Sequence, residues 1–564
     1  MGIHINDNIM IDKYLPRREF ATYEDFKENY KVNVPENFNF AYDIMDEWAK
    51  QCPNDPALLW CNETGNDKIL TFADIKRESN KVANALQGMG ISKGDRVMLI
   101  LMQRVEVWTT IIALQKLGAV VIPVTYLLTA KDIVYRCNQA EVKMIISIDD
   151  AVVRGHIQHA KEDCVTLKTI CIVGETTDGF VDFRRVVSEA SEHFTRPVGE
   201  MATKSKDPML IYFSSGTTGM PKMILHNFSH PLGHIVTAKY WQHASKGSRH
   251  MVSADSGWAK FGWGKIYGQW ICGAVIVAYD VAKFDAKNML ETIERVRPEV
   301  FCAPPTIFRF LIREDISSFD LSSIKHCTIA GEPLNPEVYN EFKRLTGICL
   351  TEGFGQSESS VLLANFEWFP VKPGSMGKPS PLYDIDIVDD MGEPCEDGIV
   401  GRIVVRNIEK RRPVGLFVEY HRDREANERA WHDDMYDTGD TAWRDADGYY
   451  WFVGRSDDII KCSGYRIGPF EVENALISHP AVLECAVTAA PDSLRGQVVK
   501  ATIVLTRDYT ASAALKKEIQ NHVKQVTAPY KYPRIVEFVS ELPKTTSGKI
   551  RRVAIRDSDN KNNP

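Results

Sequence analysis

Short apolar segments alternate with amphipathic helical segments along most of this 564-residue chain, and this alternation limits the possible folds more than any other feature. The clearest expected strands are 97–102, 118–124, 144–148, 169–173, 274–279 and 300–304. Between them lie helical patterns such as 71–90, in which Thr71 and Asp74 form a capping box. Apolar strands separated by helices are typical of parallel sheets covered on both faces. We therefore expect an α/β fold.

The pattern changes after about residue 456. Two apolar segments, 498–506 and 534–542, flank a polar helix at 513–526, which indicates a small α+β unit of roughly a hundred residues. Because 564 residues exceed what one hydrophobic core usually holds together, a division into domains is expected. We place the boundary in the charged segment GRSDDIIKCSGYR. The expected architecture is a large N-terminal domain of several subdomains, 1–456, with parallel-rich sheets covered by helices, and a small mobile α+β domain, 457–564.

Charge and hydropathy argue against two classes of partner. A net charge of −7 and an isoelectric point near 6.1 leave no basic stripe of the kind that binds a phosphate backbone. The longest apolar run, ICGAVIVAY, is far shorter than the ~18 residues that a membrane span requires. We expect no nucleic-acid partner and no membrane span.

Cysteine usage and the N-terminal segment bear on the compartment. The cysteines lie between Cys52 and Cys485 without a C-x-x-C pair, which fits buried, reduced thiols better than disulfides or a zinc site. The N-terminal segment has no charged-then-apolar signal pattern, and Asn6 stands where a myristoylation motif requires Ser or Thr. These features predict a cytoplasmic protein.

A polar, glycine-rich loop follows the apolar segment MLIYF. The stretch YFSSGTTGMPKMILH, 212–226, combines hydroxyl side chains, glycines and Lys222. Glycines let backbone N–H groups approach an anion, and hydroxyls and a lysine add donors and charge, so such a loop can cradle phosphates. It is not a Walker A loop, which requires G-x-x-x-x-G-K-[ST]. Alone, the pattern leaves a surface turn as an alternative.

Further polar loops bent by glycine or proline follow other apolar segments. They are IAGEPLNPE (329–337), TEGFGQSES (351–359), YDTGD (436–440), GRSDD (454–458), SGYRIGPFEVE (463–473) and PKTTSGKIRR (543–552). Each alone is a weak signal. Together, in this order and at this spacing, they resemble the adenylate-forming superfamily of acyl-CoA synthetases, peptide-synthetase adenylation domains and luciferases. The resemblance extends from about residue 40 onward, and SGWAKFGWGKIYGQW, TAPYKYPR and PKTTSGKIRR look most similar to the medium-chain acyl-CoA synthetases.

The resemblance implies a two-step reaction that uses ATP, Mg²⁺ and coenzyme A. ATP converts a small-molecule carboxylic acid to an acyl-adenylate with release of pyrophosphate, and the thiolate of coenzyme A then displaces AMP. Carried over position by position, the residues expected to bind ATP are Ser214, Ser215, Gly216, Thr217, Thr218, Gly219, Lys222, Gly331, Glu332, Pro333, Glu352, Gly353, Phe354, Gly355, Gln356, Ser357, Asp440, Arg455, Arg466 and Lys549.

Individual roles within this set are implied by the same resemblance. The loop 214–222 would wrap the β- and γ-phosphates, 331–333 would line the adenine pocket, and Phe354 would stack on the base. Ser357, at a position that is more often Thr in the superfamily, would meet the α-phosphate. Glu358 would bind Mg²⁺, a hard cation that prefers oxygen ligands.

The ribose and a phosphate are assigned to three further residues. Asp440 would accept hydrogen bonds from both ribose hydroxyls, with Arg455 assisting, and Arg466 would reach a phosphate. The alternative for Asp440 and Arg455 is an ordinary surface ion pair.

The small domain is expected to supply the catalytic lysine. Lys549 would bridge the attacking carboxylate and the α-phosphate, and would thus place a cation where negative charge builds up in the transition state; Ser357 and Glu358 are the other expected catalytic residues. Acetylation of Lys549 would remove this charge, so it is an expected form of regulation. Asp457 is the expected hinge. The residues expected to bind coenzyme A are Ser463, Gly464, Tyr465, Arg495 and Arg534, with a surface role as the alternative for the two arginines.

The acyl pocket is expected to be lined by Trp258, Ala259, Lys260, Cys302 and Gly355. In acetate-specific relatives a tryptophan at the position of Gly355 closes the pocket, so glycine here predicts an open cavity and a short- to medium-chain acid, branched acids included. Lys260 leaves two interpretations open: contact with a carboxylate or polar acyl group, or extension into solvent. The aromatic residues 258, 263, 267 and 270 are interpreted as pocket wall or core.

Several alternatives stay open or are disfavoured. His226, His230 and His234 have the spacing of metal ligands on one helix face. Because Pro231 and Gly233 would interrupt a helix there, we expect no metal at these three histidines. The alternative functions are an aromatic-acid (benzoate-type) CoA ligase, a stand-alone adenylation enzyme that loads a carrier protein, a luciferase-like oxidase and a non-catalytic nucleotide sensor. The presence of both a catalytic lysine and a Mg²⁺-binding glutamate disfavours the sensor. Association into a homo-oligomer is left open.

Overall fold

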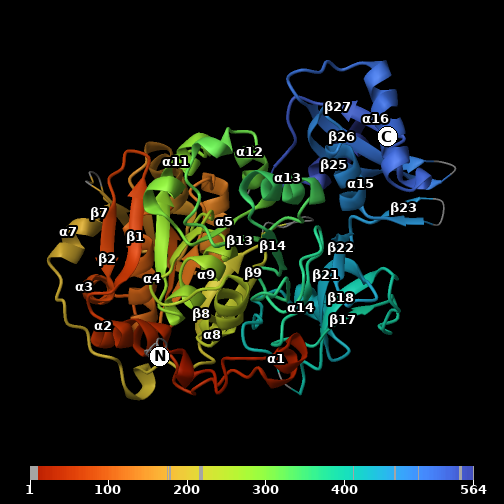
Figure 1. Cartoon of the computed structure of the whole chain (residues 1–564). Coiled ribbons are helices and arrows are strands. Elements are labelled where there is room, and N and C mark those ends of the chain that lie inside the picture. Colours follow the sequence, from red (N-terminus) through yellow and green to blue (C-terminus); the bar gives the residue numbers. More distant parts are fainter. Residues whose placement is uncertain are drawn as a thin grey trace.

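The computed structural model describes residues 10–174, 176, 179–214, 220–410, 412–462, 465–492, 495–544 and 549–562. Figure 1 shows a large body and, beside it, a small unit formed by the blue, C-terminal part of the chain. None of the helices in these ranges combines the length and the apolar character needed to cross a bilayer.

One sheet of the large body is mostly parallel. Its strands are β1 (Pro56–Asn62), β2 (Lys68–Thr71), β10 (Arg249–Val252), β11 (Val275–Asp280), β12 (Val300–Ala303), β13 (His326–Ile329), β14 (Leu350–Phe354), β15 (Leu363–Ala364) and β16 (Lys378–Pro379). Their order is β16-β15-β14-β13-β12-β10-β11-β1-β2. Strands β10 to β14 run parallel, so the segments that follow β12, β13 and β14 leave the sheet at the same edge.

A second sheet supplies the expected phosphate loop. Its strands are β3 (Arg96–Ile100), β4 (Val120–Pro123), β5 (Val142–Ile148), β6 (Thr169–Val173), β7 (Val181–Asp182), β8 (Pro208–Phe213), β9 (Met223–Asn227) and β19 (Glu419–Tyr420). Their order is β19-β9-β8-β4-β3-β5-β6-β7, with β3 to β8 parallel. The loop after β8 returns as antiparallel β9, and β9 pairs with β19. This pairing brings the distant segment 419–420 beside β9.

Helices cover both sheets, as expected for an α/β fold. Those of the large body are α1 (Tyr23–Asn29), α2 (Glu47–Gln51), α3 (Phe72–Gly88), α4 (Val105–Leu117), α5 (Ala130–Ala140), α6 (Ala151–Ala160), α7 (Phe183–Ser188), α8 (His230–Ile235), α9 (Ala259–Gly264), α10 (Tyr267–Ile271), α11 (Ala286–Val296), α12 (Pro305–Leu311), α13 (Pro336–Thr346) and α14 (Arg424–Ala430). Short 3₁₀ turns lie at Ile11–Lys13, Lys161–Asp163, Gly199–Met201, Ile316–Ser318 and Pro529–Lys531, and π-helical turns at Ala41–Asp46 and Val236–Trp241. The capping box of Thr71 and Asp74 is confirmed at the start of α3.

The apolar core has two main parts in the large body. One cluster joins residues of both sheets and the helices between them. The other packs α11, α12 and α13 against the outer face of the first sheet, with Leu290, Phe308 and Phe342 among its buried side chains. All twelve cysteines are free and nine of them are buried, which confirms that most serve as small apolar core residues.

A third sheet and the small unit complete the chain. The third sheet consists of β17 (Ile385–Val388), β18 (Gly401–Arg406), β20 (Trp431–His432), β21 (Met435–Arg444) and β22 (Tyr450–Arg455). The small unit contains β23 (Ile460–Cys462), β24 (Tyr465–Ile467), β25 (Val482–Asp492), β26 (Gly496–Leu505), β27 (Ile535–Phe538), α15 (Pro469–Ile477), α16 (Ala513–Val526) and α17 (Arg552–Asn562). It has its own core, from Ile460 to Val536.

Candidate functional site

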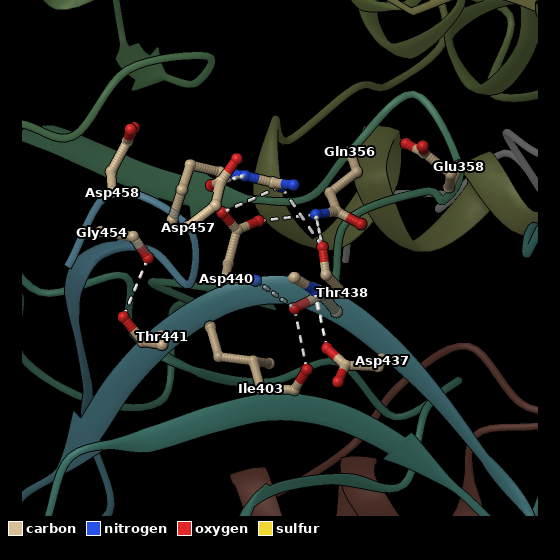
Figure 2. Close-up of polar contacts among 12 residues, drawn as sticks. Gln356, Glu358, Ile403, Asp437, Thr438, Asp440, Thr441, Gly454, Asp457 and Asp458 are labelled. Atoms are coloured by element: carbon tan, nitrogen blue, oxygen red, sulfur yellow. Dashed lines mark hydrogen bonds and ion pairs between the residues drawn. The ribbon is translucent and has the colours of Figure 1, made fainter. Parts of the chain in front are cut away.

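The segment after β14, residues 355–359, is fixed by side chains from several other segments. Gln356 lies at its centre, and Figure 2 shows its amide pointing at Asp440 on β21. The Gln356 Nε2 atom donates to Asp440 Oδ2 at 2.6 Å and to the Thr438 carbonyl at 2.8 Å. The hydroxyl of Tyr436 donates to Gln356 Oε1 at 2.7 Å. Strand β21 therefore fixes this loop through its alternate residues.

Ser357 and Glu358, the expected α-phosphate and Mg²⁺ residues, are held by contacts that sequence reasoning missed. His226 Nε2, at the end of β9, donates to the Ser357 carbonyl at 2.8 Å. The Tyr420 hydroxyl, on β19, donates to Glu358 Oε1 at 2.8 Å, and the Phe417 N–H donates to the Glu358 carbonyl at 2.7 Å. The β9–β19 pairing thus brings these partners to the loop. No short-range sequence signal identifies them.

The charge of Lys222, in the expected phosphate loop, acts on Glu358, in the loop after β14. Burial raises the pKa of Glu358, while the Tyr420 hydrogen bond and the positive charges of Arg455 and Lys222 lower it. Lys222 Nζ lies 4.7 Å from the centroid of the Tyr420 ring, and its backbone N–H donates to Ser214 Oγ at 3.0 Å. Lys222 and Ser214 are therefore next to the proposed metal ligand. The expected residues Ser215, Gly216, Thr217, Thr218 and Gly219 lie outside the described residues.

Asp440 and Arg455 face each other across β21 and β22. Arg455 Nη1 lies 3.3 Å from Asp440 Oδ1, and Asp440 is only 5% exposed. Burial raises the pKa of Asp440, and the charges of Arg455 and Lys549 lower it. The alternative of a surface ion pair is wrong, because the carboxylate is buried and also bound by Gln356. The side chain of Arg466, on β24, lies outside the described part of the structure.

The expected adenine segment 331–333 follows β13. Gly331 has φ of 101°, a conformation that glycine adopts at little cost. Glu332 accepts a hydrogen bond from Thr306 Oγ1 at 2.8 Å. On the neighbouring strand, Phe354 is partly buried with its ring 6.2 Å from Phe452. Glu352 is buried, accepts from the Leu334 N–H at 3.3 Å, and has its pKa raised to about 8 by burial.

Lys549 reaches the site from the small unit. Its positive charge lowers the pKa of both Asp440 and Lys260, so it acts on residues of β21 and α9. Residues 545–548 before it lie outside the described ranges. After it, Arg552 Nη2 binds both carboxylate oxygens of Glu473 at 2.8 Å, and Arg556 forms an ion pair with Asp458. The lysine is thus carried by a segment anchored at the start of α17.

The expected hinge and coenzyme A residues have ordinary local contacts. Asp457 lies 3.8 Å from Arg455 Nε. Tyr465 is 51% exposed and stacks on Tyr530, with ring centroids 4.1 Å apart. Arg495 lies 3.6 Å from Asp492, and Arg534 Nη1 donates to the Tyr532 hydroxyl at 2.9 Å. Ser463 and Gly464 are not among the described residues. The hinge and coenzyme A assignments stay predictions.

The wall expected for the acyl group differs from the prediction at Gly355. A Cβ at Gly355 would lie 2.3 Å from Cη2 of Trp263, so the expectation of an open cavity beside Gly355 is wrong: an indole from α9 fills that space. Lys260, for which two interpretations were open, is partly exposed, and its Nζ donates to the Ala330 carbonyl at 2.9 Å. Trp258, Ala259 and Lys260 lie at the start of α9, and Cys302 is buried on β12.

Two of the three histidines, His230 and His234, lie on a helix that the sequence argued against, whereas His226 lies on β9. Helix α8 begins at His230 with Pro231 in its first turn, where the missing N–H has no intrahelical partner to lose. Gly233 faces the backbone of Gly415, 2.4 Å from where a Cβ would lie. The rings of His230 and His234 bond to each other through Nε2 atoms 3.1 Å apart, and burial lowers the pKa of His234 to about 3. No metal-binding group of three or more ligands occurs among the described residues.

Comparisons with known proteins agree with the fold described above. Residues 45–409 match the family model described as "AMP-binding enzyme", and residues 471–549 match "AMP-binding enzyme C-terminal domain". The chain is 42% identical over 550 residues to acyl-coenzyme A synthetase ACSM3, mitochondrial, of Rattus norvegicus, covering 96% of this chain and 93% of that protein. It is 42% identical over 556 residues to acyl-coenzyme A synthetase ACSM5, mitochondrial, of Homo sapiens, covering 97% and 94%.

Solved structures show the same fold. The anthranilate CoA ligase AuaEII in complex with anthranoyl-AMP matches with a TM-score of 0.85 and 30% identity, covering 93% of this chain and 98% of that chain. A benzoate CoA ligase from Burkholderia xenovorans LB400 matches with a TM-score of 0.80 and 25% identity, covering 92% and 100%.

Proposed function

Since this chain belongs to the AMP-binding enzyme family, we propose that it is an AMP-forming acyl-CoA synthetase that activates a short- to medium-chain carboxylic acid through an acyl-adenylate. The observation that carries the proposal is the buried carboxylate expected to bind ribose, Asp440, which is bound by Gln356 and Arg455; the charge of Lys549, from the small unit, also lowers its pKa. A site that joins atoms of both units suits a reaction in which a nucleotide and an acid must meet. The relatives named acyl-coenzyme A synthetases support the same activity.

In the first half-reaction, the large domain orients ATP. Asp440, fixed by Arg455 and Gln356, accepts from the ribose hydroxyls, and Lys222 with the loop around it binds the outer phosphates. Glu358 fits Mg²⁺, because it offers a carboxylate oxygen beside Lys222 and is oriented by Tyr420. When bound, the metal neutralises phosphate charge. Lys549 stabilises the charge that develops as the acid attacks the α-phosphate.

In the second half-reaction, the small domain presents coenzyme A. We assign the pantetheine path to the segment 463–465 and the phosphates of the coenzyme to Arg495 and Arg534. The thiolate attacks the acyl carbon, the carbon–oxygen bond to AMP breaks, and the thioester leaves with AMP as the other product. Rotation about Asp457 would exchange the two faces of the small domain.

A second candidate keeps the chemistry and changes the acid. The structural similarity to an anthranilate and a benzoate CoA ligase favours an aromatic acid as the alternative substrate. A stand-alone enzyme that loads a carrier protein would share only the first half-reaction.

The decisive experiment is ATP–pyrophosphate exchange on a panel of linear, branched and aromatic acids, followed by AMP and thioester formation with and without coenzyme A. A synthetase gives exchange with a defined set of acids and thioester only with coenzyme A. Transfer that requires a carrier protein would assign the carrier-loading function. Nucleotide binding without exchange for any acid would assign the sensor and refute the proposal.

Three further assignments belong to the proposal. Acetylation of Lys549 would switch off the first half-reaction, and the check is whether a deacetylase restores activity to protein carrying acetyl-lysine at 549.

A cytoplasmic location is proposed from the sequence, whereas the named relatives are mitochondrial. Cell fractionation decides between the two locations. Association into a homo-oligomer is tested by light scattering of the full chain.

A further inference from the structure

A buried histidine holds the backbone of Ser357. His226, which is 0% exposed on β9, lies with its Nε2 atom 2.8 Å from the Ser357 carbonyl oxygen. Ser357 itself is partly exposed, and its hydroxyl makes no hydrogen bond to another residue within the described ranges. The backbone at this position is therefore fixed by a side chain, whereas the hydroxyl is left available for a ligand.

The chemistry of this contact determines where the His226 proton lies. A carbonyl oxygen only accepts hydrogen bonds, so Nε2 carries the proton. The other ring nitrogen, Nδ1, is buried and has no hydrogen-bond partner among the described residues. A second proton on Nδ1 would be an unsatisfied buried donor, and burial lowers the pKa of His226 to about 4. His226 is therefore a neutral ring whose single N–H points at Ser357.

Helix α8 supports the His226 ring from the side away from β8. The His230 ring packs against the His226 ring with centroids 3.9 Å apart. His230 and His234 share a hydrogen bond between Nε2 atoms that lie 3.1 Å apart, and Tyr267 stacks on His234 with centroids 5.9 Å apart. All of these side chains are buried. The orientation of the His226 ring is therefore set by packing within the core.

We propose that His226 is a positioning residue of the first half-reaction: by donating to the Ser357 carbonyl, it orients this segment so that the Ser357 hydroxyl meets the α-phosphate. The inference rests on the proposed function and adds to it a residue that acts through another. The neighbours Gln356 and Glu358 have partners of their own on β21 and β19. Loss of the His226 donor should therefore disturb Ser357 more than the rest of the loop.

The first test separates the donor from the ring. His226→Phe keeps an aromatic ring against His230 and removes the donor, whereas His226→Gln removes the ring and keeps an amide N–H near the position of Nε2. We expect His226→Phe to lower the kcat of ATP–pyrophosphate exchange about tenfold, with little change in the KM for ATP, because the ribose and the outer phosphates are bound by other residues. His226→Gln should restore most of the rate.

The matched control is another buried histidine. His250 on β10 is 0% exposed, and neither of its ring nitrogens has a hydrogen-bond partner among the described residues. His250→Phe makes the same change of side chain in the core and should leave pyrophosphate exchange unchanged.

A double-mutant cycle tests whether His226 acts through Ser357. Ser357→Ala should itself slow exchange, and adding His226→Phe to it should cause no further loss, because the hydroxyl that His226 orients is already absent. A purely structural role would lower the rate by the same factor in both backgrounds. Thermal melting reports whether each variant is folded. If His226→Phe is not, His226→Asn, whose amide is too short to replace Nε2, takes its place in the cycle.

Three results would overturn the inference. The first is a wild-type exchange rate in the variant that lacks the donor. The second is the same loss of rate in the Ser357→Ala background, which would make His226 a residue of the core alone. The third is a His226→Gln variant as slow as His226→Phe, which would assign the effect to the ring. All three presuppose exchange by the wild type, whereas no exchange by the wild type with any acid would refute the proposed function itself.

Discussion

The loop 355–359 of the large domain and the segment that carries Lys549 hold their functional groups in opposite ways. The loop is bound by β21, β9, β19 and α9, through hydrogen bonds to Gln356, Ser357, Glu358 and Ser359. Lys549 depends on anchors of its own unit, Arg552 and Arg556, and reaches the large domain through its charge. The side proposed to bind the nucleotide is thus preorganised by packing, and the small domain is proposed to deliver one cation to it.

The largest expected effect removes that cation. Lys549→Ala should slow adenylation by about two to three orders of magnitude, the usual contribution of such a preorganised electrostatic group. Thioester formation from supplied acyl-adenylate should survive, because the large domain and the coenzyme A face are unchanged. Single-turnover assays of each half-reaction measure the two rates.

The matched control lies on the same segment. Lys544 pairs with Glu484 at 2.8 Å, so Lys544→Ala changes a nearby lysine without touching the nucleotide. It should leave both half-reactions unchanged. Equal loss of both half-reactions in Lys549→Ala would contradict the division between the two regions.

The next effect concerns the free energy of unfolding that is lost when the Glu352 carboxyl is buried. Burial raises the pKa of Glu352 to about 8, from an ordinary value near 4.5. Between these values the folded protein keeps a proton that the unfolded chain has released, so the stability contributed by Glu352 is present at low pH and lost as pH rises toward 8. Glu352→Gln, which stays neutral, should gain stability relative to wild type between pH 5 and pH 9, on the order of a few kcal/mol.

Thermal melting at pH 5, 7 and 9 measures this difference. Glu337→Gln, at an exposed position at the start of α13, is the control and should show no pH-dependent difference. A Tm difference for Glu352→Gln that is the same at every pH would contradict the assignment of a protonated buried carboxyl.

A smaller effect is expected for the partner of Glu358. Tyr420→Phe removes the hydroxyl that donates to Glu358 Oε1, and this hydrogen bond lowers the pKa of Glu358 against the effect of burial. Without it the carboxyl stays protonated to higher pH, and protons compete better with Mg²⁺. The Mg²⁺ concentration for half-maximal rate should rise about tenfold, more at pH 6 than at pH 8.

Initial rates over a Mg²⁺ series at both pH values test this. Tyr23→Phe is the control, because its hydroxyl is also buried and donates at 2.8 Å, to the Pro379 carbonyl. An unchanged Mg²⁺ dependence in Tyr420→Phe would show that Glu358 does not hold the metal.

The same contrast explains what the sequence revealed and what it missed. Loops such as 355–359 and 436–440 were found because their motifs are short and local. The residues that fix the loop 355–359, which are His226, Trp263 and Tyr420, lie 131, 96 and 62 positions from their partners, and no local pattern links positions so far apart. A glycine in the sequence shows only that no side chain is present at that position. The sequence therefore did not show that Trp263 fills the space beside Gly355.

The bounds of strands also depend on contacts that a local sequence pattern does not show. The strand expected at 169–173 and the helix expected at 513–526 agree with β6 and α16. The strand expected at 97–102 ends at Ile100 in β3, although Leu101 and Met102 stay buried. An apolar run reports burial, whereas a strand also needs a neighbour to pair with.

The smallest expected effect lies on the face assigned to coenzyme A. Tyr465 and Tyr530 stack with their ring centroids 4.1 Å apart and an interplanar angle of 17°, and the two residues are 51% and 39% exposed. Tyr530→Ala should remove about 0.5–1.5 kcal/mol of ring contact and raise the KM for coenzyme A a few-fold. Pyrophosphate exchange should stay at the wild-type rate, since the nucleotide side is fixed by contacts within the large domain. Tyr530→Phe keeps the ring and should behave as wild type. A fall in pyrophosphate exchange in Tyr530→Ala would mean that the stacked pair also supports the first half-reaction, and that the two regions are less independent than their contacts imply.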